Sequence, residues 1–359
     1  MENPTLTTQA SRQPPIPAVG SALSASATPE IARAAPDGFA AAHPPRAVLL
    51  DIYLKMAQTR CFEETAARLF SQGKVHGTAH FCVGEEAAGI GVTAALEPED
   101  LIYATHRGHG QSIGKGMDIG RMMAEFLGKA TGVCKGKGGC MHIADLQAGN
   151  LGANGVVGAQ LPIAVGAALS TRLQNIDRVV VCFFGDGACN EGAFHEALNL
   201  ASIWRLPVLF LCVNNQYGMS MHVSAHVNVP DLAVRAQAYG MPGWSVDGND
   251  AVAVWREARR ARELARTQGP CLLVANTYRI MGHSKSDNNA YRDKAVTEQW
   301  KVRCPIKRLR QWLLDQKLAD EAELDRLSAR AEQDIQAALA FAEASPDPDL
   351  SAALEDVYA

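Results

Sequence analysis

The sequence lacks the features of a membrane protein, a disulfide-stapled scaffold or a nucleic-acid-binding chain. Its longest apolar runs, residues 179–184 and 206–213, are far shorter than the roughly 20 residues that span a bilayer. The nine cysteines include no C-x-x-C pair, which argues against structural zinc and a secreted disulfide framework. Acidic residues outnumber basic ones by 38 to 34, so no sequence-wide positive field favours nucleic acid or an anionic membrane.

Two glycine motifs of nucleotide-binding proteins are also missing from the glycine-rich segments. Residues 135–139 contain no G-x-x-x-x-G-K-[ST] sequence, and residues 152–158 do not fit the pattern G-x-G-x-x-G. Binding of ATP or of a nicotinamide nucleotide is therefore disfavoured.

The first 45 residues differ in composition from the rest of the chain. They are rich in Pro, Ala, Ser and Thr, lack an apolar h-region and contain few arginines, which is atypical of a signal or transit peptide. We therefore expect residues 1–45 to form a disordered N-terminal arm and residues 46–359 to form one globular domain. The odd cysteine count and the scattered cysteine positions favour a reducing, cytoplasmic location.

The apolar pattern beyond residue 46 predicts a doubly wound parallel α/β fold with a helical C-terminal part. Helical spacing recurs over residues 47–72, 160–173, 190–204, 251–266, 305–316 and 320–343. Continuous apolar runs, typical of strands covered on both faces, occupy residues 178–184, 207–213 and 271–277. Residues 73–158 are so dense in glycine that we expect loops there more than regular structure.

Polar residues follow two of the predicted strands. Gly185-Asp186-Gly187 ends the first, and 26 residues separate that triplet from Asn214-Asn215 after the second. Because ligands of open α/β sheets bind at the carboxyl ends of the strands, Asp186 and Asn215 could supply oxygen ligands to one Mg²⁺ ion. Since Mg²⁺ usually shares its shell with phosphates, a diphosphate is the natural remaining ligand. The alternative is an Asp that caps the next helix and an Asn pair in a turn.

This arrangement resembles the magnesium- and diphosphate-binding motif of thiamine-diphosphate enzymes. Further segments of the same kind are residues 77–86, 106–110, 135–142, 154–160 and 278–287. Together they resemble one family of that class, the α subunit of the dehydrogenase component in pyruvate, branched-chain 2-oxo acid and acetoin dehydrogenase complexes. The resemblance implies an enzyme with the thiamine-diphosphate-binding fold that depends on thiamine diphosphate and Mg²⁺.

The resemblance also implies which residues form the site. It places at the cofactor His106, Arg107, Gly155, Val157, Gly185, Asp186, Gly187, Asn215, Tyr217 and His283. Asp186 and Asn215 would bind the metal by their side chains, and Tyr217 by its backbone carbonyl. His80 and His283 match the two catalytic histidines nearest the reacting carbon, where a pKa near neutrality suits proton transfer.

Three other implied roles have simpler alternatives. Arg107 offers a planar fork of donors for a diphosphate oxygen, or it forms a surface ion pair. Gly155 and Val157 match positions whose backbone binds the aminopyrimidine ring, or they form a plain loop-to-helix turn. Ser284 and Ser286 flank a loop that is phosphorylated in some relatives, but a solvated loop is the default expectation.

Residues 47–359 leave no length for a second α/β domain, which in this class supplies the carboxylate that activates the cofactor. The family uses a separate β subunit, so the resemblance implies an α₂β₂ heterotetramer. The implied reaction cleaves acetoin, or decarboxylates pyruvate, to a hydroxyethyl adduct. The acetyl group then passes to a lipoyl group on an acyltransferase core.

The substrate is a small ketone or 2-oxo acid. Residues 129–139, 142–145 and 283–287 look more similar to acetoin than to pyruvate dehydrogenases, whose loop usually has Met where Lys285 stands. We therefore favour acetoin over pyruvate, with branched-chain 2-oxo acids third. The other functions considered are a non-catalytic structural subunit, which the intact site residues disfavour, and a single-chain enzyme such as a transketolase, which the length disfavours.

Overall fold

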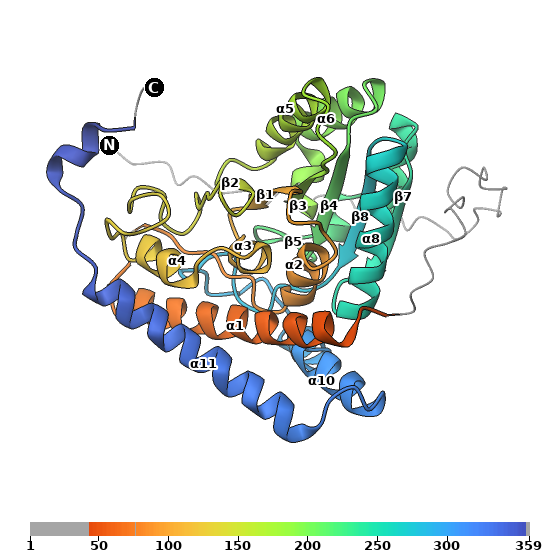
Figure 1. Ribbon diagram of the computed structural model, residues 1–359. Coiled ribbons are helices and arrows are strands. Elements are labelled where there is room, and N and C mark those ends of the chain that lie inside the picture. Colours follow the sequence, from red (N-terminus) through yellow and green to blue (C-terminus); the bar gives the residue numbers. More distant parts are fainter. Residues whose placement is uncertain (1–42, 76, 357–359) are drawn as a thin grey trace, which may run out of the picture. The chain divides into compact units, whose positions relative to one another are not determined.

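A six-stranded parallel sheet lies at the centre of the part of the chain that the computed structural model describes, residues 43–75 and 77–356 (Figure 1). In spatial order its strands are β2 (Asn150–Asn154), β1 (Leu101–Thr105), β3 (Val180–Gly185), β4 (Val208–Asn214), β8 (Cys271–Asn276) and β7 (Gly243–Asp247). All five pairings are parallel. A separate antiparallel ribbon consists of β5 (Tyr217–Gly218) and β6 (Met221–His222).

Helices cover both faces of the sheet. One face carries α1 (Arg46–Ser71), α2 (Glu86–Thr93), α8 (Ala251–Thr267) and α10 (Pro305–Asp315). The other carries α5 (Gln160–Leu173), α6 (Gly192–Ile203) and the 3-10 helix η3 (Leu232–Tyr239). Side chains of β3 alternate between the faces, with Val181 and Phe183 in the first core and Cys182 and Phe184 in the second. Because both faces are buried, the strand has the continuous apolar sequence from which it was predicted.

The C-terminal part is helical, as expected. The remaining elements are α3 (His109–Lys115), α4 (Ile119–Phe126), α7 (Val223–His226), α9 (Lys294–Val302), α11 (Glu321–Ala344), η2 (Asp186–Asn190) and η4 (Leu350–Leu354). The helix α11 runs beside α1 and also packs on α4 (Figure 1). Phe62 of α1, Phe126 of α4 and Ile335 of α11 belong to a third apolar cluster between these helices. The predicted parallel α/β architecture with a helical C-terminal part is confirmed.

The expectation that residues 73–158 hold more loop than regular structure is confirmed, and ten glycines of this region have positive φ, but its five short elements were not predicted. This region contains α2, β1, α3, α4 and β2, each five to eight residues long. Elements this short fall below the window over which hydrophobic periodicity is visible. The predicted helix over residues 190–204 begins instead at Gly192, because η2 occupies the residues just before it.

The glycine-rich segment after α4 surrounds a carboxylate of the chain itself. Glu125 is completely buried, and its Oε2 accepts hydrogen bonds from the N–H groups of Cys134 and Gly136 at 2.8 and 2.9 Å. Its Oε1 accepts from the N–H groups of Gly138 and Gly139 at 2.7 and 3.0 Å. These four backbone N–H groups already donate to Glu125, so they are not free to bind a phosphate as the amides of a P-loop do.

The described chain begins just before the predicted domain boundary. Residues 1–42 of the predicted arm lie outside the described residues. The ring of His43 lies 5.6 Å from that of Trp312, and α1 begins at Arg46 as expected.

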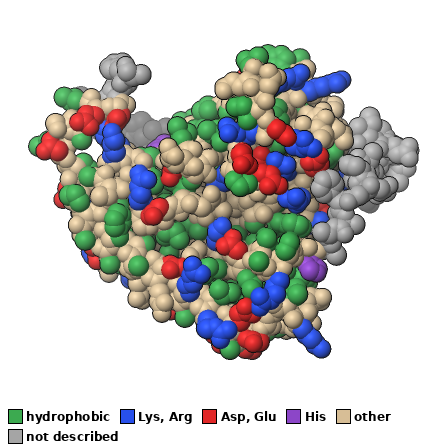
Figure 2. Space-filling view, viewed as in Figure 1, with side chains coloured by type: hydrophobic (Ala, Val, Ile, Leu, Met, Phe, Trp, Pro, Cys, Tyr) green, Lys and Arg blue, Asp and Glu red, His purple; other side chains and the backbone are tan. Residues whose placement is uncertain are grey.

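The described surface mixes charges of both signs. Figure 2 shows basic and acidic side chains interspersed on one face of the molecule. Arg308, for example, bridges Asp247 and Asp250 at 2.8 and 3.4 Å. Among the described residues, no helix combines the length and the apolar character needed to cross a membrane.

Candidate active site

A cavity of about 470 Å³ lies at the carboxyl ends of β2, β1 and β3. Thr105, Asn154 and Gly185 line it and are the last residues of β1, β2 and β3. This is the edge of the sheet at which open α/β folds bind ligands. All the residues that the sequence placed in the site line this cavity: His80, His106, Arg107, Gly155, Val157, Gly185, Asp186, Gly187, Asn215, Tyr217 and His283.

The loops that follow β3 and β4 lie against each other. The two strands pair in register up to Gly185 and Val213. Beyond them, a Cβ atom built on Gly187 would lie 3.3 Å from the Cα atom of Gly218. A side chain at Gly187 would press on the facing backbone, so glycine permits the two loops to approach closely. This contact brings the G-D-G loop and the asparagine loop to the same cavity.

The two asparagines after β4 make different contacts. Asn214 Nδ2 donates to Asn276 Oδ1 at 2.8 Å and so links the ends of β4 and β8. Asn215 Nδ2 donates to Glu85 Oε1 at 2.9 Å, and its Oδ1 accepts from the N–H of Tyr217 at 3.3 Å. Of the two, only Asn215 lines the cavity, as the family pattern implies.

Asp186 carries a buried carboxylate oxygen that lacks a donor. The residue is 1% exposed, and no hydrogen-bond donor among the described residues reaches its Oδ2. His226 Nε2 lies 3.3 Å from this atom but outside hydrogen-bond geometry. The following helix α6 has Glu191 at its N-cap and receives no side-chain cap, so Asp186 does not cap it. Since an unpartnered buried carboxylate is costly, this oxygen fits a site for a hard cation.

His80, His106 and His283 form a cluster inside the cavity. The ring of His80 lies 4.8 Å from that of His106 and 4.9 Å from that of His283. Burial, together with the charge of Arg107, lowers the pKa of His80 to about 3 and that of His283 to about 4. The same causes lower the pKa of His106 well below its usual value. All three rings are therefore neutral at pH 7, which differs from the near-neutral pKa that we expected.

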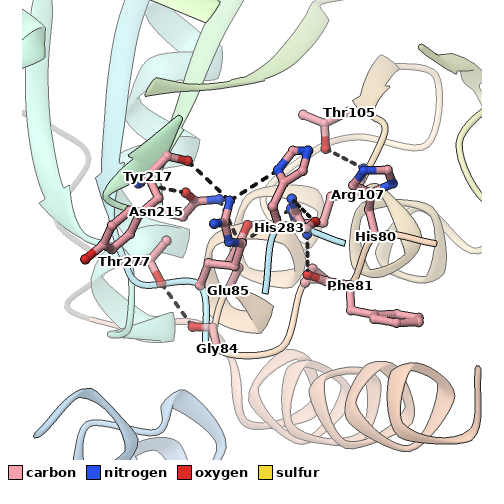
Figure 3. A network of polar contacts seen from close by, with 12 residues as sticks. His80, Phe81, Gly84, Glu85, Thr105, Arg107, Asn215, Tyr217, Thr277 and His283 are labelled. Carbon is pink, nitrogen blue, oxygen red and sulfur yellow. Dashed lines mark hydrogen bonds and ion pairs between the residues drawn. The ribbon is translucent and has the colours of Figure 1, made fainter. Parts of the chain in front are cut away.

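Arg107 joins the two segments that carry His80 and His283 (Figure 3). Its Nη1 donates to the carbonyl of Phe81 at 2.8 Å, and its Nη2 donates to the carbonyl of His283 at 3.0 Å. A guanidinium has five N–H groups, so donors remain for the diphosphate oxygen that the resemblance implies.

Comparisons with known proteins agree with this geometry. A family model described as dehydrogenase E1 component matches residues 54–351. The alpha subunit of acetoin:2,6-dichlorophenolindophenol oxidoreductase from Bacillus subtilis (strain 168) is 46% identical over 86% of this chain and 92% of that protein. The same subunit from Cupriavidus necator is 41% identical over 86% and 94% of the two chains. A chloroplastic pyruvate dehydrogenase E1 component subunit alpha-3 from Arabidopsis thaliana is 37% identical over 86% and 74%.

The chain belongs to the dehydrogenase E1 component family. This membership confirms the resemblance drawn from the motifs. It also confirms the class, a thiamine-diphosphate-dependent dehydrogenase, and the role of an alpha subunit.

Three ionisable residues that line the cavity were not selected from the sequence: Glu85, Arg279 and His226. Glu85 and Arg279 stand inside the quoted segments 77–86 and 278–287, so membership of a motif was the signal that could have found them. His226 stands outside every motif, and only the fold brings it to the cavity.

Burial shifts the pKa of the first two of these residues. Burial raises the pKa of Glu85 to about 7, although Arg107, Arg279 and the bond from Asn215 act in the opposite direction. Burial lowers the pKa of Arg279 to about 10, and its guanidinium donates to the carbonyls of Tyr217 and Met219 at 3.3 and 2.7 Å. Arg279 therefore remains charged at pH 7 and adds positive charge to the cavity.

A buried network supports His80 from outside the E1 cavity. Glu63 and His109 are completely buried, with 3.1 Å between Glu63 Oε2 and His109 Nδ1. Burial alone would lower the pKa of His109, but the charge of Glu63 raises it well above its usual value. His109 Nε2 lies 3.6 Å from Cys140 Sγ, which accepts from the N–H of His80 at 3.3 Å. Cys140 thus holds the backbone of His80 in place.

The E1 chain should lose stability as the pH falls from 6.5 to about 4. His80 and His283 stay neutral in the folded state, whereas the unfolded chain takes up protons below its ordinary histidine pKa of about 6.5. Because the unfolded state then binds more protons, the free energy of unfolding rises with pH in this range, by up to about 1.4 kcal/mol per pH unit for each histidine.

Urea unfolding at pH 7 and pH 5 tests this expectation. His80→Gln should lose less stability between the two pH values than the parent chain. His195→Gln, on the exposed surface of α6, serves as the control and should behave as the parent. Equal losses in His80→Gln and the parent would contradict the burial argument.

Proposed function

We propose that this E1 chain binds thiamine diphosphate and Mg²⁺ in the cavity and, with a β subunit, cleaves acetoin. The observation that carries the proposal is that one cavity is lined by a carboxylate oxygen of Asp186 that accepts no hydrogen bond from the described residues, an oriented amide on Asn215 and a cluster of neutral histidines. Thiamine diphosphate, when bound, supplies an electron sink for the carbanion left by C–C cleavage.

The chain supplies oxygen ligands and positive charge for the diphosphate and its metal. Asp186 Oδ2, Asn215 Oδ1 and the carbonyl of Tyr217 are the proposed ligands of Mg²⁺, which keeps its other positions for phosphate oxygens and water. The Tyr217 carbonyl accepts one N–H from Arg279 and retains a second lone pair. Arg107 and Arg279 provide the charge that a diphosphate requires.

His80 and His283 are the proposed carriers of substrate protons. A neutral imidazole can accept a proton at one ring nitrogen and donate one from the other. Release of acetaldehyde from acetoin requires that the substrate hydroxyl loses its proton, whereas release of carbon dioxide from pyruvate has no such requirement. Both rings are neutral at pH 7 and offer a nitrogen lone pair to the substrate hydroxyl, although a pKa of about 3 or 4 makes each of them a weak base.

Exposed apolar side chains at the rim of the cavity support the proposal that a partner subunit binds there. Val157, Met219 and Met221 line the cavity but are 50%, 65% and 52% exposed. Large apolar side chains that are exposed together fit a protein interface. The described residues form one parallel sheet, so a second α/β domain would come from the partner. We place a β subunit here, in an α₂β₂ heterotetramer whose partner supplies the activating carboxylate and which passes the acetyl group to a lipoyl-bearing acyltransferase.

Acetoin is the favoured substrate, and pyruvate and branched-chain 2-oxo acids are the alternatives. The similarity of the 129–139, 142–145 and 283–287 segments to acetoin dehydrogenases supports this choice. So does the identity to the relatives named for acetoin, 46% and 41%, against 37% to the pyruvate dehydrogenase subunit.

Dye reduction by the chain co-expressed with its β subunit tests the proposal. We expect kcat/KM with acetoin to exceed that with pyruvate or 3-methyl-2-oxobutanoate by at least about tenfold, a difference of about 1.4 kcal/mol in transition-state stabilisation. A higher value with pyruvate would reassign the substrate. No reduction with any of the three, in protein shown to bind the cofactor, would favour the structural subunit instead.

A further inference from the structure

Glu85 lines the cavity but has no role in the mechanism proposed above. It precedes α2, and the next residue, Glu86, turns its side chain to Arg60, with 2.6 Å between Arg60 Nε and Glu86 Oε1. The carboxylate of Glu85 lies instead between Asn215 and Arg107 (Figure 3). Two adjacent glutamates thus serve different parts of the structure.

The backbone that carries Glu85 is held in place by its neighbours. Thr277 Oγ1 donates to the carbonyl of Gly84 at 3.0 Å, and the N–H of Gly84 donates to Glu86 Oε2 at 3.0 Å. Gly84 has a φ of +100°, and a Cβ atom there would lie 2.5 Å from the carbonyl oxygen of Tyr278. Only glycine suits this position, and the close packing gives Glu85 a fixed base.

The contact with Glu85 determines which way the amide of Asn215 faces. Asn215 Nδ2 lies 2.9 Å from Glu85 Oε1, and Arg107 Nε lies 3.9 Å from the same atom. Because two donors approach this oxygen, it acts as an acceptor whether or not the carboxyl group carries a proton. A rotated amide would place two oxygens in contact. Oδ1 of Asn215 therefore occupies the other end of the amide, beside the N–H of Tyr217 at 3.3 Å.

We propose that Glu85 is a positioning residue that presets Asn215 for the metal ion. By binding Nδ2, it keeps Oδ1 beside Tyr217, so that two of the proposed ligand residues are arranged before the cation arrives. Without this acceptor, the amide could rotate and present an N–H group to the cation. This inference rests on the metal site of the proposed function and goes beyond it by adding a residue that does not touch the metal. Outer-shell partners of this kind typically contribute 10- to 100-fold to metal affinity.

The test uses Mn²⁺ as a spectroscopic probe in place of Mg²⁺. The chain, assembled with its β subunit and thiamine diphosphate but without substrate, is titrated with Mn²⁺ and followed by electron paramagnetic resonance. We expect the dissociation constant of Mn²⁺ to rise by about 10- to 100-fold in Glu85→Ala. Glu85→Gln retains an oxygen acceptor of the same shape and is the matched control, for which we expect a rise of less than about threefold.

A second measurement separates positioning from a merely structural role. Calorimetry at saturating Mn²⁺ should give the same affinity for thiamine diphosphate in Glu85→Ala and in the parent. Weaker cofactor binding at saturating metal would overturn the inference, because Glu85 would then contact the cofactor or maintain the cavity in general. An unchanged Mn²⁺ affinity in Glu85→Ala would also overturn it, provided that Asp186→Ala abolishes binding. If Asp186→Ala binds Mn²⁺ normally, the proposed metal site itself fails.

Discussion

Asp186→Ala should abolish the metal-dependent binding of thiamine diphosphate. The carboxylate is 1% exposed, and its Oδ2 has no donor among the described residues. Loss of a direct ligand should cost more than the 10- to 100-fold that outer-shell partners contribute, so we expect affinity to fall by more than about 100-fold. Calorimetry on the protein assembled with its β subunit, with Mg²⁺ and then with a chelator, measures the effect.

The same substitution should not destabilise the metal-free protein. A buried carboxylate that lacks a donor opposes folding, so its removal should leave the free energy of unfolding unchanged or raise it. Asp177→Ala is the matched control, because it removes the same type of side chain from the opposite end of β3. The Asp177 side chain is 72% exposed and pairs with Arg266. Cofactor affinity that survives in Asp186→Ala would refute the metal assignment, and a large loss of stability would show that the carboxylate has a structural role.

Glu125→Ala should lower the free energy of unfolding by at least about 3 kcal/mol. The side chain is completely buried and accepts hydrogen bonds from the N–H groups of Cys134, Gly136, Gly138 and Gly139. A fully buried N–H group left without an acceptor costs about 1–3 kcal/mol, these four groups are partly buried, and a domain has only about 5–15 kcal/mol of stability in total. Part of the cost is recovered where water enters the vacated space, so the four costs do not simply add.

Glu125→Gln distinguishes a lost acceptor from a lost volume. Glutamine fills the same space, but its NH₂ group would face two N–H donors, so we expect a loss between those of the parent and Glu125→Ala. Glu343→Ala, which removes a half-exposed partner of Lys74, is the control and should change stability by less than about 1 kcal/mol. Equilibrium unfolding in urea measures all three variants. A loss below about 1 kcal/mol in Glu125→Ala would contradict the role of this carboxylate in organising the glycine-rich segment.

The accuracy of the sequence prediction depended on the local signal of each element. The strands β3, β4 and β8 were predicted because they are buried on both faces and therefore consist of continuous apolar residues. The strands β1 and β2 were missed because they are only five residues long and lie among glycines. Their place beside β3 depends on pairing with distant strands, which no local window contains.

The site residues were predictable where the chemistry is local to a motif. Asp186 and Asn215 were found because an acidic and an amide side chain each follow a strand, and parallel strands end at a common edge. Glu85 was quoted within a motif but received no role, because its partner Asn215 is 130 residues away. His226 carried no signal at all, since its proximity to the cavity arises only when the chain folds.

The sequence by itself determined the family, the parallel α/β fold and eleven of the residues that line the cavity, because residue types and their spacing along the chain carry that information. Only the tertiary structure decided how those residues are protonated and paired. It keeps His80 and His283 neutral, assigns the glycine-rich amides to Glu125 and sets Glu85 against Asn215. Burial and contacts between distant segments produce these properties, and neither exists until the chain is folded.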